Sequence, residues 1–380
     1  MFHLLGEVEV VFGFWALVLI LAMALVSGGN AAVSYTESRQ YTEPLFVFVV
    51  MVVAASRPML EMVRSVLAAI ARLLPLRNSL AQVWLGLAVV PLTGSFITEP
   101  AAMTLAALML APQIFRHDVP EWLKYGAIGV LFVNVSIGGV LTSYAAPPVL
   151  MVAAKWQWDS LHMLSQFGWK AALAVALNAS AISFLLRTHI PDTAPPKAEE
   201  AAAVPALVSL IHLAFLASVV AFAHHPVFFI GLFLFFLGYT QAYERHQSPL
   251  ILKEGLLVGF FLAGLVVLGG LQQWWLQAVV AGLQPAELFL GAVGLTAITD
   301  NAALTYLGSL ITGIPDESKY ALLAGAVAGG GLTVIANAPN PAGAALLRRG
   351  FRDESIGAFG LLLGAALPTM VAASFLYLLP

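Results

Sequence analysis

Long stretches of apolar residues follow one another along the chain, with few charged positions between them. Clear examples lie at 12–27, 204–222, 255–270 and 357–379. An α-helix needs about 20 mostly apolar residues to cross the hydrocarbon core of a bilayer. These runs are too long and too continuous for the alternating pattern of an outer-membrane β-barrel. The pattern therefore predicts an all-α membrane protein.

The boundaries of the runs predict about nine full spans and two interrupted segments. The full spans are expected at 8–28, 44–66, 121–154, 163–188, 204–224, 226–243, 250–276, 318–347 and 356–379. The segments 80–114 and 283–313 are too long for one span and carry polar residues in the middle, so each is expected to be a re-entrant hairpin. The Pro-rich, charged stretch 190–205 is expected to link two halves.

An internal repeat supports this division. Three blocks recur in the same order: SFITEPAAMT (95–104) with TAITDNAALT (296–305), GGVLTSYAAPP (138–148) with GGGLTVIANAP (329–339), and YTESRQYTEPL (35–45) with YTQAYERHQSPL (239–250). Chance similarity between apolar helices explains these matches poorly, because they include Thr, Gly, Pro and acidic residues. Each unit is expected to hold a hairpin followed by a discontinuous helix, because Gly and Pro interrupt 121–154 and 318–347.

The two units are expected to have opposite orientations. The first repeat takes 1–189 and the second 226–380, and an extra helix at 206–225 adds one crossing between them. Arginines precede the first hairpin (Arg64, Arg72, Arg77) and follow the second broken helix (Arg348, Arg349, Arg352). The positive-inside rule then places the N-terminus and the linker in the cytoplasm and the C-terminus outside. Inverted repeats are a common design of secondary transporters.

Composition narrows the class of protein further. Hydrophobic residues make up 60% of the chain and charged residues 10%, against about 25% charged in soluble domains. The net charge of −3 gives no reason to expect nucleic acid as a partner. Cysteine is absent, and no Ser-His-Asp arrangement is discernible, so neither an enzyme nor a bound cofactor is expected. Residues 1–9 lack the basic region and cleavage site of a signal peptide, so the first run is expected to remain as a helix.

Two acidic residues, Glu99 and Asp300, lie in the middle of the interrupted segments. A carboxylate at membrane depth is costly and is a functional candidate by default. Each limb of about 16 residues would rise about 24 Å, which brings both acids close to the midplane. Oxygen-rich sites with one or two carboxylates suit hard cations such as Na⁺. The alternative is that both acids cap helices or lie in surface loops.

Polar residues around these acids extend the predicted site. The hairpin tips add Ser95, Thr98, Thr299 and Asn301. The breaks in the discontinuous helices add Thr142, Ser143, Thr333, Asn337 and Asn340. An unwound segment in a membrane must be buried in protein or line a cavity. The alternative is a proline kink with glycines for close helix packing.

Two further acids, Glu61 and Glu254, lie within apolar helices. Either could relay protons. Because Arg57 and Arg64 lie near the first and Lys253 adjoins the second, salt bridges at the membrane interface are the favoured interpretation.

The segment TDNAALT (299–305), followed by AGGGLTVIANAPNPAG (328–343), resembles the ion transporter superfamily, and within it the bacterial Na⁺/H⁺ antiporter family. This resemblance implies a core of hairpins and broken helices that moves against a scaffold as an elevator, a homodimer, and location in a bacterial inner membrane. It also implies one site that combines residues of the second repeat (Thr299, Asp300, Asn301, Asn337, Asn340) with Ser95, Thr98 and Glu99 of the first. The sequence departs from the pattern at Pro100, which stands where the second copy has Asn301.

The leading hypothesis is a secondary transporter that exchanges Na⁺ or another monovalent cation for protons at Glu99 and Asp300. The alternative is an ion-coupled symporter of a small organic anion or a metal–anion complex, with Asn337 and Asn340 as ligands. Acids at both hairpin tips disfavour an anionic substrate by repulsion. A membrane enzyme or a channel is the third possibility, and an enzyme would need a constellation of nucleophile and base that is not discernible.

Overall fold

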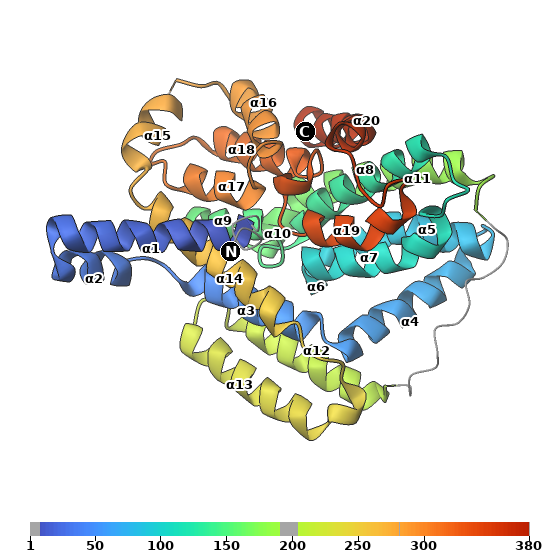
Figure 1. The fold of residues 1–380 in the computed structure, drawn as a ribbon, viewed down its shortest axis with the longest axis horizontal. Helices are drawn as coiled ribbons and strands as arrows, with labels where there is room; N and C mark the ends of the chain where they lie inside the picture. The colour runs from blue at the N-terminus through green and yellow to red at the C-terminus, as the bar shows by residue number, and fades with distance from the viewer. Residues whose placement is uncertain (1–7, 191–203, 281, 380) are drawn as a thin grey trace.

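The computed structural model describes residues 8–190, 204–280 and 282–379, and all regular structure within these ranges is helical. Residues 1–7 and most of the predicted linker (191–203) lie outside the described residues. The α-helices are α1 (Val8–Ser27), α2 (Gly29–Glu37), α3 (Thr42–Ala54), α4 (Arg57–Leu73), α5 (Asn78–Leu87), α6 (Val89–Ile97), α7 (Glu99–Ile114), α8 (Glu121–Gly138), α9 (Pro147–Trp156), α10 (Ser160–Met163), α11 (Trp169–Leu186), α12 (Ala206–Ala221), α13 (Pro226–Ala242), α14 (Leu252–Gly269), α15 (Gln273–Val280), α16 (Pro285–Thr296), α17 (Asn301–Ser309), α18 (Asp316–Gly329), α19 (Asn340–Leu347) and α20 (Ala358–Leu378). Short 3₁₀-helices are η2 (Gly139–Leu141), η4 (Glu244–His246), η5 (Val334–Ala336) and η6 (Arg348–Gly350), and η3 (Leu164–Gly168) is a π-helical turn. Figure 1 shows their arrangement.

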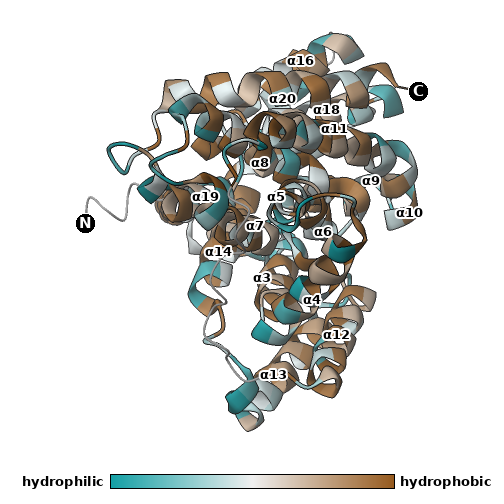
Figure 2. Ribbon diagram, turned by 90° about the vertical axis from the view of Figure 1, so that its right-hand side faces the viewer, coloured by the Kyte–Doolittle hydropathy of each residue, from teal (hydrophilic) through white to brown (hydrophobic). Residues whose placement is uncertain are grey.

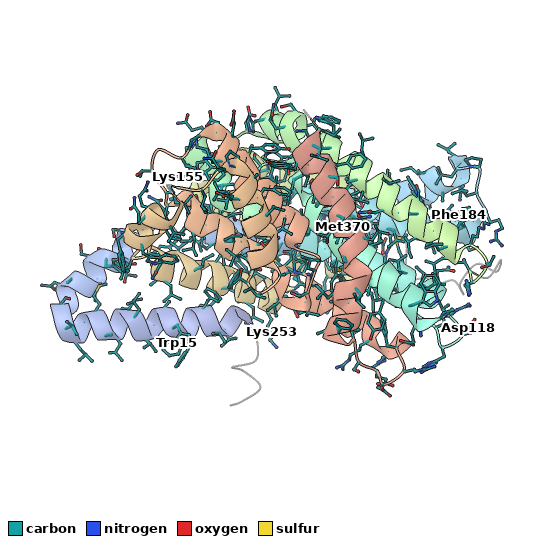
Figure 3. The ribbon with its side chains drawn as sticks, turned by 90° about the horizontal axis from the view of Figure 1, so that it is seen from above. Trp15, Asp118, Lys155, Phe184, Lys253 and Met370 are labelled. Carbon is teal, nitrogen blue, oxygen red and sulfur yellow. The ribbon has the colours of Figure 1, made fainter. Side chains whose placement is uncertain are left out.

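The outer surface of the helices is apolar, as a lipid environment requires. Trp15 on α1 is 54% exposed and Met370 on α20 is 59% exposed, and Figure 3 labels both. Figure 2 shows hydrophobic residues along most helices and hydrophilic residues mainly at helix ends and connections. Within the described ranges, five helices are long and apolar enough to cross a membrane, or up to seven if each of two bent pairs is one span. The predicted total of about nine spans stays a prediction, because breaks divide several of these segments into shorter helices.

Four segments differ from the sequence prediction, and one of them is the first limb of the hairpin 80–114, which is two helices, α5 and α6, bent by 44° at Ala88. The helix expected at 44–66 is two helices, α3 and α4, bent by 63° at Ala55 and Ser56. Pro58 in the first turn of α4 lacks an N–H donor, and its ring would clash with the carbonyl of Ala54 four residues earlier in a continuous helix, so α3 ends at Ala54 and a new helix begins. The helix expected at 250–276 ends at Gly269, and α15 is separate. The stretch 29–37, for which no helix was expected, forms α2.

Two large hydrophobic cores organise the described residues. The first core buries side chains of α5 to α9, α11, α18 and α20. The second core buries side chains of α3, α12, α13 and α14. Ile97 and Ala101 beside the first hairpin tip, and Ala302 and Ala303 beside the second, belong to the second core. Both hairpin tips therefore lie where the two cores meet.

Each hairpin packs against parts of both broken helices. In the first half, α6 packs against α8, and in the second half α16 packs against α18. The second limb of each hairpin contacts the broken helix of the other half: α7 contacts α19, and α17 contacts α9. Each hairpin thus touches the first part of its own broken helix and the second part of the other one. This arrangement brings the two breaks and the two tips to one place.

Candidate functional site

The first hairpin turns at Thr98, which has a backbone φ of +74°. A positive φ is strained for a β-branched residue, and such strain is typical of functional sites. The turn makes Glu99 the first residue of α7, with Pro100 in the first helical turn, where its missing N–H is not needed. Glu99 is fully buried. The backbone turn at Thr98 therefore places the Glu99 carboxyl group in the protein interior at the hairpin tip.

Asn337 binds this carboxyl group from the opposite half of the chain. Its amide nitrogen Nδ2 donates a hydrogen bond of 2.9 Å to Glu99 Oε2. Glu99 Oε1 has no hydrogen-bond partner among the described residues. Asn337 is also buried, and its own Oδ1 has no partner within the described residues. One amide thus ties the first hairpin to the second broken helix and leaves two buried oxygens available as ligands.

The second hairpin turns at Asp300, the N-cap of α17. Asp300 Oδ1 accepts hydrogen bonds from Ala302 N (2.8 Å) and Ala303 N (3.1 Å). The helix-capping alternative raised by the sequence is therefore correct for this residue, although Asp300 is buried (6% exposed) rather than at the surface. Asp300 also lies near enough to Glu99 for the two carboxyl groups to interact electrostatically. The structure thus brings together the two predicted acids.

A cavity of about 20 Å³ lies beside the two tips. Its lining consists of Phe261, Asp300, Val334, Ile335, Asn337, Ala338 and Pro341. A cavity needs about 10–15 Å³ to hold one water molecule, so this one accepts a single water or a small cation. Asp300 and Asn337 supply its polar wall, and Phe261 of α14 supplies an apolar one. The sequence carried no signal for Phe261, because it is one of many phenylalanines in apolar helices.

Buried oxygen atoms without hydrogen-bond partners occur at both hairpin tips and at the second break. Within the described residues they include Thr98 Oγ1, Glu99 Oε1, Thr296 Oγ1, Asn301 Oδ1, Asn337 Oδ1 and Asn340 Oδ1. Buried polar atoms are normally paired, so several unpaired oxygens at two tips and one break call for an explanation. Oxygen atoms of carboxylate, amide and hydroxyl groups are the ligands that hard cations prefer. The set has the chemistry of a cation site.

The other two asparagines hold the broken segments together. Asn340 Nδ2 donates to Gly330 O (2.8 Å) and Thr333 O (2.9 Å), two carbonyl oxygens of the unwound stretch. Asn301 Nδ2 donates to Ser136 Oγ at 3.4 Å. The Asn340 amide thus satisfies backbone carbonyls that the break leaves without helical partners, and the Asn301 amide joins the second hairpin tip to α8.

Several of the predicted hydroxyl residues form hydrogen bonds between a hairpin and the break in a discontinuous helix. Ser95 Oγ donates to Gly138 O (2.7 Å) and accepts from Leu141 N (2.9 Å). Thr142 Oγ1 donates to Ser95 O at 2.6 Å. In the second half, Thr333 Oγ1 donates to Ala297 O at 2.8 Å. Each hairpin is thus bonded to its own broken helix, through Thr142 in the first half and through Thr333 in the second.

Of the predicted ligands, Asp300 and Asn337 line the small cavity itself, and two others face different surroundings altogether. Thr299 is exposed, and its hydroxyl donates to Leu295 O within its own hairpin limb. Ser143 Oγ lies 3.1 Å from Ser160 Oγ, on a different cavity. Neither residue meets the buried acids, because Thr299 faces outward and Ser143 faces the other cavity. Of the further acids, Glu61 forms the expected salt bridge with Arg57 (2.6 Å), and Glu254 is exposed at the start of α14.

Gly139 leaves space for the Glu99 carboxyl group at the first hairpin tip. A Cβ atom at this position would collide with Glu99 Oε1 and would lie 3.0 Å from Ala146 Cβ. We expect Gly139→Ala to displace the Glu99 carboxyl group, to destabilise the protein by about 1–3 kcal/mol, and to reduce transport. Thermal unfolding of the detergent-solubilised variant measures the first effect.

Gly294→Ala is the matched control for Gly139→Ala. No heavy atom lies within 4 Å of the Cβ that this substitution would add to α16. In a helix interior, alanine is favoured over glycine by up to about 1 kcal/mol. We expect Gly294→Ala to unfold at the same temperature as the parent protein or slightly higher. Equal destabilisation of both variants would contradict a specific role for Gly139.

The fold and the site together define a multi-pass membrane transporter with a buried, oxygen-lined site between two broken helical units. The chain belongs to the family described as "Putative Na+/H+ antiporter", whose model matches residues 1–379. This match confirms the resemblance seen in the sequence. The transporter YdaH of Alcanivorax borkumensis, whose crystal structure is described as revealing an unusual topology, matches with a TM-score of 0.51 and 14% identity over 97% of this chain and 96% of that one. At this identity the likeness concerns the fold alone. No curated protein matches the chain by sequence.

Proposed function

We propose that the protein is a secondary active transporter that exchanges Na⁺, or another monovalent cation, for protons across a bacterial inner membrane. One observation carries this proposal: Asn337 bonds the buried carboxyl group of Glu99 and lines the same cavity as Asp300. Membership of the antiporter family supports it. Cation and proton are then alternative occupants of one small site.

The exchange follows from charge balance at the site. A carboxylate in a medium of low dielectric constant is stable only if a counter-charge or a proton neutralises it. A cation in the cavity can bind Asp300 and the unpaired Oδ1 of Asn337. When the cation leaves, protons bind to Asp300 and Glu99 and neutralise the carboxylates in its place. Binding of one species therefore favours release of the other.

Alternating access requires the site to open to each side in turn. The tips lie at the boundary between two hydrophobic cores, so sliding of one core along the other would carry the site with it. The predicted topology puts Lys155 outside and the connection between α7 and α8 in the cytoplasm. Figure 3 shows Lys155 and Asp118, which lies in that connection, at opposite ends of the molecule. The proposed motion is an elevator-like shift of the hairpins and broken helices.

Reconstituted protein tests this function directly. In proteoliposomes with an acidic interior, addition of Na⁺ outside should dissipate the pH gradient, and liposomes without protein should show no such change. Li⁺ and K⁺ added in the same way measure the cation preference. If the gradient persists with every monovalent cation, the antiport proposal is wrong. Collapse of the gradient only when a dicarboxylate is added with the cation would favour the anion symporter instead.

A further inference from the structure

A second, larger cavity of about 570 Å³ lies between the first half of the chain and the end of α12 with its following turn. Its walls come from the start of α3, the break after η2, α9 with the following turn, and the turn between α12 and α13. Polar side chains on these walls include Glu43, Ser143, Asp159, Ser160 and His224. We name it the Glu43 cavity. It is separate from the small cavity at Asp300, with which it shares no lining residue.

The Glu43 cavity runs from the protein surface to the interior. Ala154, Asp159 and His224 on its rim are exposed, whereas Phe46 and Leu150 on its floor are buried. A large cavity with polar walls and an exposed rim fills with water. The cavity therefore brings solvent into the membrane-embedded part of the protein.

One wall of this cavity adjoins a segment that is bonded to the first hairpin. Ser143 and Tyr144, which line it, follow Thr142 directly in the unwound break. Thr142 bonds to Ser95 of the hairpin limb that ends at the Glu99 tip. The same break begins at Gly139, against which Glu99 packs. A short series of bonded and contacting residues therefore connects this wall of the cavity with Glu99.

Glu43 is the half-buried acid of this cavity. His224 faces it closely enough to interact electrostatically, and Asp159, on the rim, caps α10 through a 2.7 Å bond from His162 N. Glu43 also lines a neighbouring cavity of about 440 Å³ that contains Arg39 and Lys155. Together with Tyr144 and Tyr306, these groups are the charged and titratable neighbours that the lining of the two cavities brings to Glu43. Its carboxylate is well placed to attract a cation from solvent.

We propose that the Glu43 cavity is the aqueous route by which the cation reaches the buried site from outside the cell, and that Glu43 is a recruiting carboxylate on that route. This inference rests on the proposed function and deepens it by naming the access path. A carboxylate in a cleft raises the local concentration of cations and speeds their binding. Because Glu43 is absent from the small cavity, it acts on binding rather than on the proton exchange itself.

Cysteine labelling tests this access path. The chain has no cysteine, so only the introduced thiol can react with the label. Ala154→Cys places a thiol on the rim of the cavity, and Asp118→Cys places one at the opposite end of the molecule. In intact cells, a membrane-impermeant maleimide should modify Ala154→Cys and leave Asp118→Cys unmodified. Inverted membrane vesicles should give the reverse pattern. Labelling of Ala154→Cys only in inverted vesicles would overturn the proposal.

Transport kinetics test the role of Glu43. We expect Glu43→Gln to raise the KM for external Na⁺ about threefold to tenfold with an unchanged kcat. Asp316→Asn is the matched control, because it removes an exposed acid at the start of α18, outside both cavities. An unchanged KM in Glu43→Gln, or an equal rise in both variants, would overturn the proposal. If the parent protein moves no protons in response to any cation, the proposed function fails, whereas the labelling pattern still reports on the cavity.

Discussion

We expect Asp300→Asn to abolish cation-driven proton movement. Asparagine is as good a helix N-cap as aspartate, so the bonds from Ala302 N and Ala303 N to the side chain can persist. Only the charge and the proton-binding capacity are lost. Interactions with a charged group are worth about 1.5–3 kcal/mol, which corresponds to about 10- to 100-fold weaker cation binding. Proton movement in proteoliposomes and Na⁺ binding in detergent measure the two effects.

Thr299→Ala is the control for Asp300→Asn. Thr299 is the neighbouring residue at the same tip, but its side chain is exposed and bonded within its own limb. Transport by Thr299→Ala should equal that of the parent protein. Normal exchange by Asp300→Asn would remove Asp300 from the site. Loss of exchange in both variants, with reduced thermal stability, would indicate damage to the hairpin tip rather than loss of a ligand.

Glu99→Gln should separate cation binding from proton coupling. The glutamine side chain keeps an oxygen that can accept the bond from Asn337 Nδ2, but it cannot take up or release a proton. In the parent protein, apparent Na⁺ affinity should rise with pH, because protons compete for the carboxyl groups. The slope approaches about tenfold per pH unit for each proton displaced. Glu99→Gln should bind Na⁺ with a shallower slope and move no protons.

Isothermal titration of Na⁺ at several pH values measures this slope. Asn337→Ala is the companion variant, because it removes the amide while leaving Glu99 able to ionise. We expect it to weaken Na⁺ binding and to keep a dependence on pH. An identical slope in Glu99→Gln and the parent protein would show that Glu99 holds no exchangeable proton, and Asp300 would then carry the exchange alone.

The division of the chain into helices was largely predictable, because it depends on local chemistry. Apolar runs predict helices, while the length of 80–114 and 283–313 with polar residues in their middle, and the Gly-rich and Pro-rich stretches near 138–148 and 329–339, predict interruptions. All of these breaks are present in the structure. Prediction failed where one apolar run conceals a bend, as at Ser56, since periodicity alone does not distinguish a bent helix from a straight one.

The sequence by itself therefore determined which residue types stand at the breaks: two acids, three asparagines and several hydroxyl groups. Only the tertiary structure decided which of them meet. Asn337 reaches Glu99 across 238 residues of chain, and Phe261 closes the cavity beside Asp300. Thr299 and Ser143, equally plausible in the sequence, face other surroundings. The physical reason is that local residue types interrupt a helix by themselves, whereas the direction of each side chain at the break depends on the helices packed around it.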